Sequence, residues 1–159
     1  MLKVLSGGQT GVDRAALDAA IAKGIACGGW CPKGGWAEDM PRPPGLLALY
    51  PMLQETPLTD PVQRTEWNVR DSDVLLVLRD NRGLSSTGTE RAILQAHALG
   101  RPVVILDVGR PEDIDHAAAC FRGGGEADRL VCIAGPRESE AAGIYREARA
   151  FLGEAFGRL

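Results

Sequence analysis

Glycine, hydroxyl and amide side chains gather at two places in this chain, each directly after a run of apolar residues. The first is Ser6-Gly7-Gly8-Gln9-Thr10-Gly11-Val12-Asp13-Arg14, which follows residues 2–5 and opens a stretch rich in Ala, Leu and Ile. The second is Ser85-Ser86-Thr87-Gly88-Thr89, which follows residues 74–78. Glycines let a backbone approach an anion closely, and the first N–H groups of a helix point at such a ligand. Both runs therefore predict loops that bind a phosphate group, although tight turns and helix caps would use the same residue types.

Polar side chains elsewhere in the chain extend this predicted site. Arg64 and Asn68 are four residues apart, so they share one helix face and can both reach a ligand. Lys33 adds a cation from a long segment without periodicity, where a solvated loop charge is the alternative. The predicted cofactor-binding residues are Gly7, Gly8, Gln9, Thr10, Gly11, Asp13, Arg14, Lys33, Arg64, Asn68, Ser86, Thr87, Gly88 and Thr89.

Several kinds of chemistry lack their sequence pattern. No Gly-Lys-Ser/Thr follows the first glycines, and Gly-x-Gly-x-x-Gly is missing there too, so neither an ATPase loop nor an ordinary dinucleotide loop is predicted. Cys27 and Cys31 have poor zinc spacing, and His97 and His116 have no ligand-like spacing. We therefore predict no metal site. If the protein is an enzyme, Glu38, Asp39 or Glu90 is the candidate acid or base.

Apolar runs and helical periodicity alternate along the chain. Strands are predicted over residues 2–5, 25–28, 73–78, 102–107 and 130–134, and helices over 11–23, 60–71, 90–99, 111–121 and 138–156. This alternation predicts an α/β fold: a Rossmann-like three-layer sandwich whose mostly parallel sheet of about five strands has helices on both faces. Ligands bind such sheets at the carboxyl ends of the strands. If strands 2–5 and 73–78 are neighbours, the two polar loops face one cleft.

Residues 29–60 lack periodicity and hold six of the ten prolines, and a seventh, Pro61, follows directly. The segment is too apolar for a disordered linker, so we expect it to fold over the ligand edge of the sheet.

Length and charge limit the remaining possibilities. A chain of 159 residues with no internal repeat predicts a single domain over residues 1–159. The net charge of -3 argues against a nucleic-acid or acidic-membrane surface. No apolar run has the length of a signal peptide or a membrane span, so a cytoplasmic location with reduced cysteines is expected.

Four blocks of the chain together resemble a known family. The run from Gly7 to Asp18 is similar to the signature of the family named putative molybdenum carrier protein, which is circularly permuted, YpsA-like and related to the SLOG/LOG Rossmann-like superfamily. Residues 28–34 with 37–39, and residues 64–73, resemble the second and third blocks of that family, and residues 86–89 lie where it has its second ligand loop. The resemblance spans about residues 1–135. It implies one Rossmann-like domain that binds molybdenum cofactor or a nucleotide-related ligand, as a homo-oligomer such as a dimer or tetramer.

The LOG relatives are phosphoribohydrolases, which release a base from a nucleoside monophosphate, and their motif resembles Gly-Gly-x-Gly-Thr-x-x-Glu. Here Gly88-Thr89 is kept, serines replace the leading glycines, and Ala92 stands in the place of the glutamate. Glu90 is two residues early, about 200° around the helix. The leading hypothesis is therefore a binding or carrier protein for a phosphate-bearing ligand. A LOG-like nucleotide hydrolase and a ligand-sensing module that acts through a partner protein are the alternatives.

Overall fold

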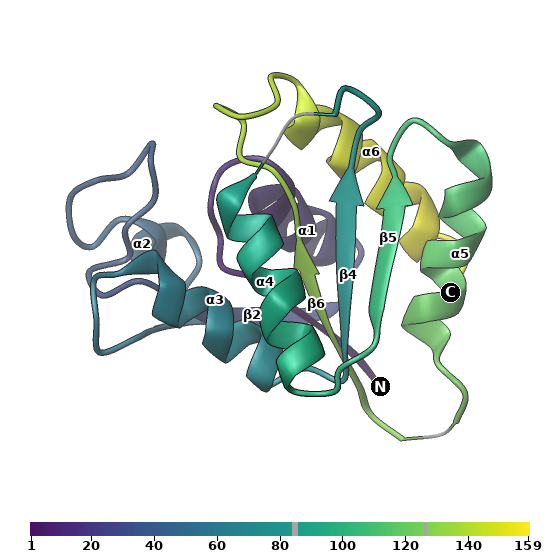
Figure 1. The fold of residues 1–159 in the computed structure, drawn as a ribbon, viewed down its shortest axis with the longest axis horizontal. Coiled ribbons are helices and arrows are strands. Elements are labelled where there is room, and N and C mark those ends of the chain that lie inside the picture. The colour runs from purple at the N-terminus through teal and green to yellow at the C-terminus, as the bar shows by residue number, and fades with distance from the viewer. Residues whose placement is uncertain (84–85, 126) are drawn as a thin grey trace.

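The computed structural model describes residues 1–83, 86–125 and 127–159, which form a six-stranded parallel sheet with helices on both faces (Figure 1). The strands are β1 (Leu2–Leu5), β2 (Ala26–Cys31), β3 (Leu53–Glu55), β4 (Val74–Arg79), β5 (Val103–Asp107) and β6 (Arg129–Ala134). The helices are α1 (Val12–Ala22), α2 (Leu46–Leu49), α3 (Pro61–Arg70), α4 (Thr87–Ala98), α5 (Pro111–Arg122) and α6 (Ile144–Phe156). The predicted three-layer α/β fold is confirmed.

Alternating side chains of the central strand define the two outer layers. Leu76 and Leu78 of β4 pack into a core cluster with residues of α1, α5 and α6. Leu75 and Val77 point to the opposite face, where α3 and α4 cover them. Since every residue from Val74 to Leu78 is buried, β4 has the apolar character on both faces that a central parallel strand needs.

The strand order is β3-β2-β1-β6-β4-β5, so β6 lies between β1 and β4. Val4 of β1 and Val74 of β4 are both in register with Val131 of β6. The prediction of a single cleft required the two strands that precede the polar loops, β1 and β4, to be neighbours. They are not, because β6 separates them. Instead, the chain that follows β6 enters between the two loops.

The proline-rich segment (residues 29–60) carries more regular structure than its sequence indicated. It contains the end of β2, the short helix α2 and the strand β3, which adds the sixth strand to the predicted five. Buried Leu46, Tyr50 and Leu53 pack with Leu17 of α1 in a third core cluster. Tertiary packing, and not local periodicity, holds this segment against the sheet.

Helix boundaries follow the capping chemistry. Asp60 caps α3 by accepting from the Val62 N–H at 2.9 Å, with Pro61 at the first helical position, as predicted. In contrast, α6 begins six residues later than the predicted residue 138. The Glu138 carboxylate accepts from the Tyr145 N–H at 3.0 Å and from the Gly143 N–H, which ends the preceding turn and starts the helix there.

Candidate functional site

Three loops meet at the carboxyl edge of the sheet, after β1, β6 and β4. Between them lies a small cavity of about 50 Å³, which we call the crevice cavity. It is lined by Gly7, Gln9, Asp13, Arg64, Thr65, Asn68, Val69, Ser86, Gly88, Thr89, Ala92, Cys132, Ile133, Ala134, Gly135, Arg137 and Glu140. Since one water needs roughly 10–15 Å³ of such space, the cavity holds about three to five water-sized atoms.

Arg64 is the buried cation of the crevice cavity. It projects from α3, its side chain is 7% exposed, and its Nη1 donates to the Gly7 carbonyl at 3.0 Å. A Cβ on Gly7 would lie 2.5 Å from Arg64 Cδ, so only glycine lets the guanidinium lie against this loop. Burial lowers the pKa of Arg64, and the nearby Asp13 opposes that shift. The guanidinium remains charged, because an arginine side chain is not deprotonated in proteins.

Asp13 supplies a carboxyl group in the first turn of α1. Its Oδ2 lies 3.9 Å from Arg64 Nη1, and its side chain is 15% exposed. Burial raises the pKa of Asp13 to about 6, although Arg64 pulls it down. A carboxyl group that titrates so close to neutral pH is characteristic of functional sites.

Gln9 presents a hydrogen-bond donor to the crevice cavity. Its Oε1 accepts from the N–H groups of Thr10 at 2.9 Å and Glu38 at 3.0 Å, which fixes the orientation of the amide. Its Nε2 is buried and has no hydrogen-bond partner within residues 1–83, 86–125 and 127–159. Gln9 is 3% exposed, so this donor depends on whatever occupies the cavity.

The first turn of α4 forms another wall. Ser86 is the N-cap, and its Oγ accepts from the Thr89 N–H at 3.4 Å and lies 3.1 Å from Glu140 Oε1. Gly88 and Thr89 line the cavity, whereas Thr87 is exposed and does not. A helix of 12 residues begins here, and its N-terminal end favours an anion.

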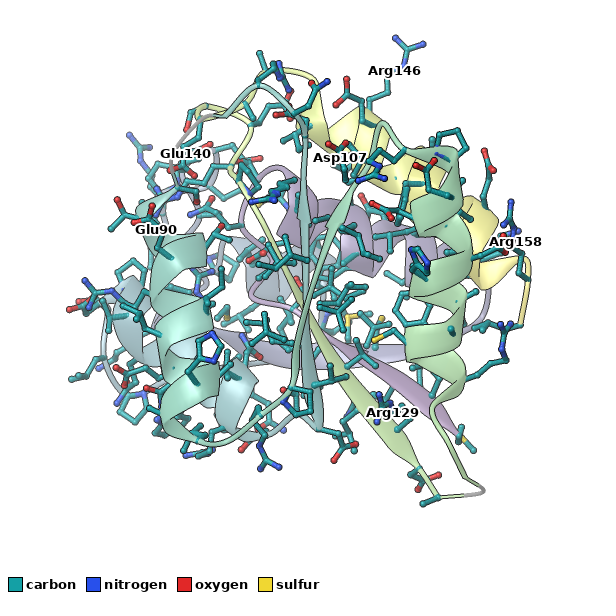
Figure 2. All side chains as sticks on the ribbon, turned by 45° about the vertical axis from the view of Figure 1, so that its right-hand side comes forward. Glu90, Asp107, Arg129, Glu140, Arg146 and Arg158 are labelled. Atoms are coloured by element: carbon teal, nitrogen blue, oxygen red, sulfur yellow. The ribbon has the colours of Figure 1, made fainter. Side chains whose placement is uncertain are left out.

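The chain after β6 contributes Arg137 and Glu140, two lining residues that the sequence analysis missed. Glu140 accepts from the Arg137 N–H at 2.9 Å. Figure 2 shows Glu140 above the first turn of α4, the turn that carries Glu90. Arg137 Nη1 lies 3.7 Å from Glu38, and its guanidinium stands 5.8 Å from the Trp36 ring centroid.

The α1 end of the first loop is less open than its sequence suggests. The Val12 N–H donates to the Pro136 carbonyl at 3.2 Å, and a Cβ on Gly11 would lie 2.2 Å from that oxygen. The Arg14 N–H donates back to the Gln9 carbonyl at 2.9 Å. The phosphate-loop pattern had predicted that the first N–H groups of α1 bind a ligand. One of them, the Val12 N–H, is instead bonded to the chain after β6.

Part of the predicted site lies in a second hollow, on the other side of Thr10. This side groove has a volume of about 810 Å³ and is lined by Thr10, Gly11, Arg14, Asp18, Glu38, Asp39, Tyr50, Glu138, Ser139, Tyr145 and Arg146. Arg14 forms a bidentate pair with Asp39 at 3.0 and 2.9 Å, and Arg146 projects from the molecule into solvent (Figure 2). Glu38 accepts from Ser139 at 2.7 Å and from the Thr10 hydroxyl, so hydrogen bonds join three residues of the groove lining.

The predicted residues therefore divide among several places. Gly7, Gln9, Asp13, Arg64, Asn68, Ser86, Gly88 and Thr89 line the crevice cavity, and Thr10, Gly11 and Arg14 line the side groove with Glu38 and Asp39. Both amide atoms of Asn68 are bonded to the Trp30 backbone, at 2.8 and 2.9 Å. Gly8 lines neither hollow, Lys33 lies among Trp36 and prolines of the proline-rich segment, and Glu90 is exposed. Ser85 lies outside the described residues.

The described residues contain neither a metal-binding cluster nor a membrane-spanning helix. No group of three or more His, Cys, Asp or Glu side chains there is arranged to hold a metal ion. All four cysteines are free thiols. None of the helices in that part of the chain combines the length and the apolar character that a membrane crossing requires.

Together the fold and the cavity define a Rossmann-like α/β protein with a small ionic cavity at the carboxyl edge of its sheet. The chain matches the model of the Circularly permutated YpsA SLOG family over residues 4–156, and it belongs to that family. It is also similar to a crystal structure from Syntrophus aciditrophicus SB whose protein is named "Putative molybdenum carrier protein". The two are 37% identical with a TM-score of 0.79, over 97% of this chain and 93% of the other. A comparison with curated proteins gave no match.

Proposed function

We propose that this chain is a binding or carrier protein for a phosphate-bearing small molecule, of the molybdenum-cofactor or nucleotide class, whose phosphate enters the crevice cavity. The observation that carries the proposal is the buried Nε2 of Gln9, which has no hydrogen-bond partner among the described residues and belongs to a cavity that Arg64 also lines. A donor and a cation in a cavity of about 50 Å³ suit an oxyanion with a few oxygens. The N-terminal end of α4 adds to the same preference.

The organic part of such a ligand requires more room than the crevice cavity has. The side groove, at about 810 Å³, lies within the size range of small-molecule sites. Thr10 in its lining directly follows Gln9, which lines the crevice cavity. The relative named as a molybdenum carrier favours a molybdenum cofactor, whose phosphate Gln9, Arg64 and Arg137 would hold. A nucleotide has the same phosphate chemistry.

The hydrolase alternative has no comparable observation behind it. Ala92 lines the crevice cavity where the LOG motif has its glutamate, and Glu90 is exposed outside it. The hydrogen bond from Arg14 lowers the pKa of Asp39. Although burial alone would raise the pKa of Glu38, hydrogen bonds from Thr10 and Ser139 lower it. Both carboxylates therefore stay ionised at neutral pH, unlike a general acid.

Native mass spectrometry and metal analysis of freshly purified protein test the proposal directly. We expect a bound phosphate-containing molecule, and the same spectrum reports whether the predicted homo-oligomer forms. After the ligand is removed, calorimetry with inorganic phosphate and with a nucleoside monophosphate should show binding. Protein that carries no such ligand and binds neither probe would refute the proposal, as would release of free base from the nucleotide.

A matched pair of substitutions tests whether the phosphate binds in the crevice cavity. Gln9→Glu replaces the buried donor with a negative charge, and we expect it to weaken phosphate binding by at least about tenfold. Gln54→Glu makes the same change at an exposed position of β3 and should bind as the unmodified chain does. Equal binding by both variants would show that the phosphate lies elsewhere.

A further inference from the structure

Asp13 is one of two carboxyl-bearing residues that line the crevice cavity, and it is the one that lies beside the buried cation Arg64. Asp13 shares the crevice cavity with Arg64 and Gln9, and its Oδ2 is 3.9 Å from Arg64 Nη1. The cavity of about 50 Å³ cannot keep an oxyanion away from that carboxylate. As long as Asp13 is ionised, an entering anion would meet a like charge at short range and compete with it for Arg64.

Every element around Asp13 contributes to its charge environment. Arg64 of α3 and Arg137 after β6 provide positive charge, and Arg14 of α1 is turned toward Asp39 in the side groove. Cys132 of β6 stays a neutral thiol, because burial raises its pKa. Glu140 is the other carboxylate in the cavity, and it is held by the Ser86 hydroxyl and the Arg137 N–H. Arg137 is itself shared with Glu38 at 3.7 Å, so Arg64 is the cation that an entering anion would take over.

We propose that an oxyanion enters the crevice cavity together with one proton, which is bound between the Asp13 carboxyl group and the anion, so that Asp13 makes ligand binding proton-coupled. The inference rests on the proposed phosphate-binding function and adds how the site selects its anion. The only covalent change is a proton transfer: an O–H bond to the proton breaks in solvent or in the ligand and one forms at the Asp13 carboxyl group, while Arg64 exchanges its Asp13 partner for the anion. The protonated Asp13 carboxyl group then donates a hydrogen bond to the anion, whereas the ionised carboxylate would repel it.

Without a ligand, Asp13 already needs only a small further rise in pKa to be protonated at neutral pH. Burial raises the pKa of Asp13 to about 6 against the opposing effect of Arg64, so a small additional negative charge is enough to protonate it near neutral pH. Gln9 Nε2 then completes the set of donors around the anion.

This coupling predicts selectivity among anions of similar size. A phosphate monoester has a second pKa near 6, so it can bring its own proton to Asp13 at neutral pH. Sulfate and molybdate carry no proton there and must recruit one from solvent. The site should therefore prefer a phosphate monoester to a fully ionised oxyanion, and the preference should disappear in acid.

Sulfate is the appropriate probe, because it does not titrate over the range of the experiment. Calorimetry between about pH 5 and about pH 8 should show sulfate affinity falling on the order of tenfold per pH unit above about pH 6. Repeating the titration at about pH 8 in buffers of different ionisation enthalpy should show uptake of about one proton per sulfate bound. The second measurement needs no variant.

Asp13→Asn removes the titrating group while keeping the size of the side chain. We expect this variant to bind sulfate with a flat pH profile, no proton uptake, and about a hundredfold higher affinity than the unmodified chain at about pH 8. Asp115→Asn removes an exposed carboxylate of α5 that pairs with Arg158, and it should leave the pH profile unchanged.

The outcomes separate this inference from the function on which it rests. Sulfate that binds the unmodified chain equally well across the pH range, without proton uptake, overturns the role of Asp13 and leaves phosphate binding standing. Failure of phosphate and sulfate to bind at any pH, to the unmodified chain and to Asp13→Asn alike, overturns both.

Discussion

At the scale of single residues, the close approach of Arg64 to the first loop depends on a missing side chain. Arg64 is 5% exposed, and its guanidinium lies where a Cβ on residue 7 would be, at 2.5 Å from Cδ and 2.6 Å from Nη1. Since the guanidinium also donates to the Gly7 carbonyl, it cannot move aside without losing that bond. Gly7 therefore has a steric role in the site in addition to any contact with a ligand.

We expect Gly7→Ala to destabilise the protein by about 1–3 kcal/mol, because it overpacks this contact, and to weaken phosphate binding by displacing Arg64. The free energy of unfolding in urea and calorimetry with phosphate measure the two effects. Gly153→Ala is the matched control. Beyond the backbone of α6 itself, no atom of the described residues lies within 4 Å of the added methyl group, so the substitution should stabilise the helix by up to about 1 kcal/mol. If both substitutions have the same small effect, the contact with Arg64 is not tight.

The locations of single side chains could be predicted from the sequence in helices but not in the long loop. Arg64 and Asn68 do share the helix face that lines the cavity, as their spacing of four predicted. Lys33 was assigned to the same site by charge alone, yet it lies among the prolines of its own segment. Helical spacing fixes direction, whereas a loop gives no such period, so its side chains can be placed only by tertiary packing.

At the scale of elements, the proline-rich segment is tied to the helices behind the sheet through one carboxylate. Asp18 of α1 accepts from the Tyr50 hydroxyl at Oδ1 and from the Tyr145 hydroxyl at Oδ2, both at 2.7 Å. Tyr50 belongs to the proline-rich segment and Tyr145 to the first turn of α6. The position of one wall of the side groove therefore depends on Asp18.

Tyr50→Phe and Tyr145→Phe each remove one of these equal hydrogen bonds. We expect each to lower the free energy of unfolding by about 1 kcal/mol. Amide hydrogen exchange should separate them, because Tyr50→Phe should increase exchange across residues 36–50 and Tyr145→Phe should not. Unchanged exchange in that range for Tyr50→Phe would mean that the other contacts of the segment, such as the packing of Leu46 and the Arg14–Asp39 pair, hold it without this hydrogen bond.

Strand order is the element-level property that the sequence could not supply. The apolar runs and capping residues located five strands and both polar loops, but chain order says little about which strands pair. Val131 of β6, near the C-terminus, pairs with both Val4 and Val74, and this brings Arg137 and Glu140 between the two loops. A signal was present, since Gly135 and polar residues follow a buried strand, which is the pattern that marked the other two loops.

At the scale of the whole molecule, the crevice cavity joins parts of the chain that are distant in sequence. Its lining comes from the loop after β1, helix α3, the start of α4 and the chain after β6. Arg64 and Glu140 are far apart in the sequence, yet both line this one cavity. An anion that bonds to several of these elements is bound only by the folded state. Ligand binding must therefore stabilise the whole fold and not one loop.

Phosphate at about one hundred times its dissociation constant should raise the free energy of unfolding by about 2.7 kcal/mol. For a chain of this size that corresponds to a rise in Tm of roughly 5–10 °C, measured by calorimetry or circular dichroism. Chloride at equal ionic strength is the control, since a spherical ion cannot bond to Gln9, Arg64 and α4 together. At about pH 8, sulfate should raise the Tm of Asp13→Asn more than that of the unmodified chain, because only the unmodified chain must first take up a proton. Equal rises in Tm with chloride and with phosphate would mean that the stabilisation is a general effect of ionic strength and not binding in the crevice cavity.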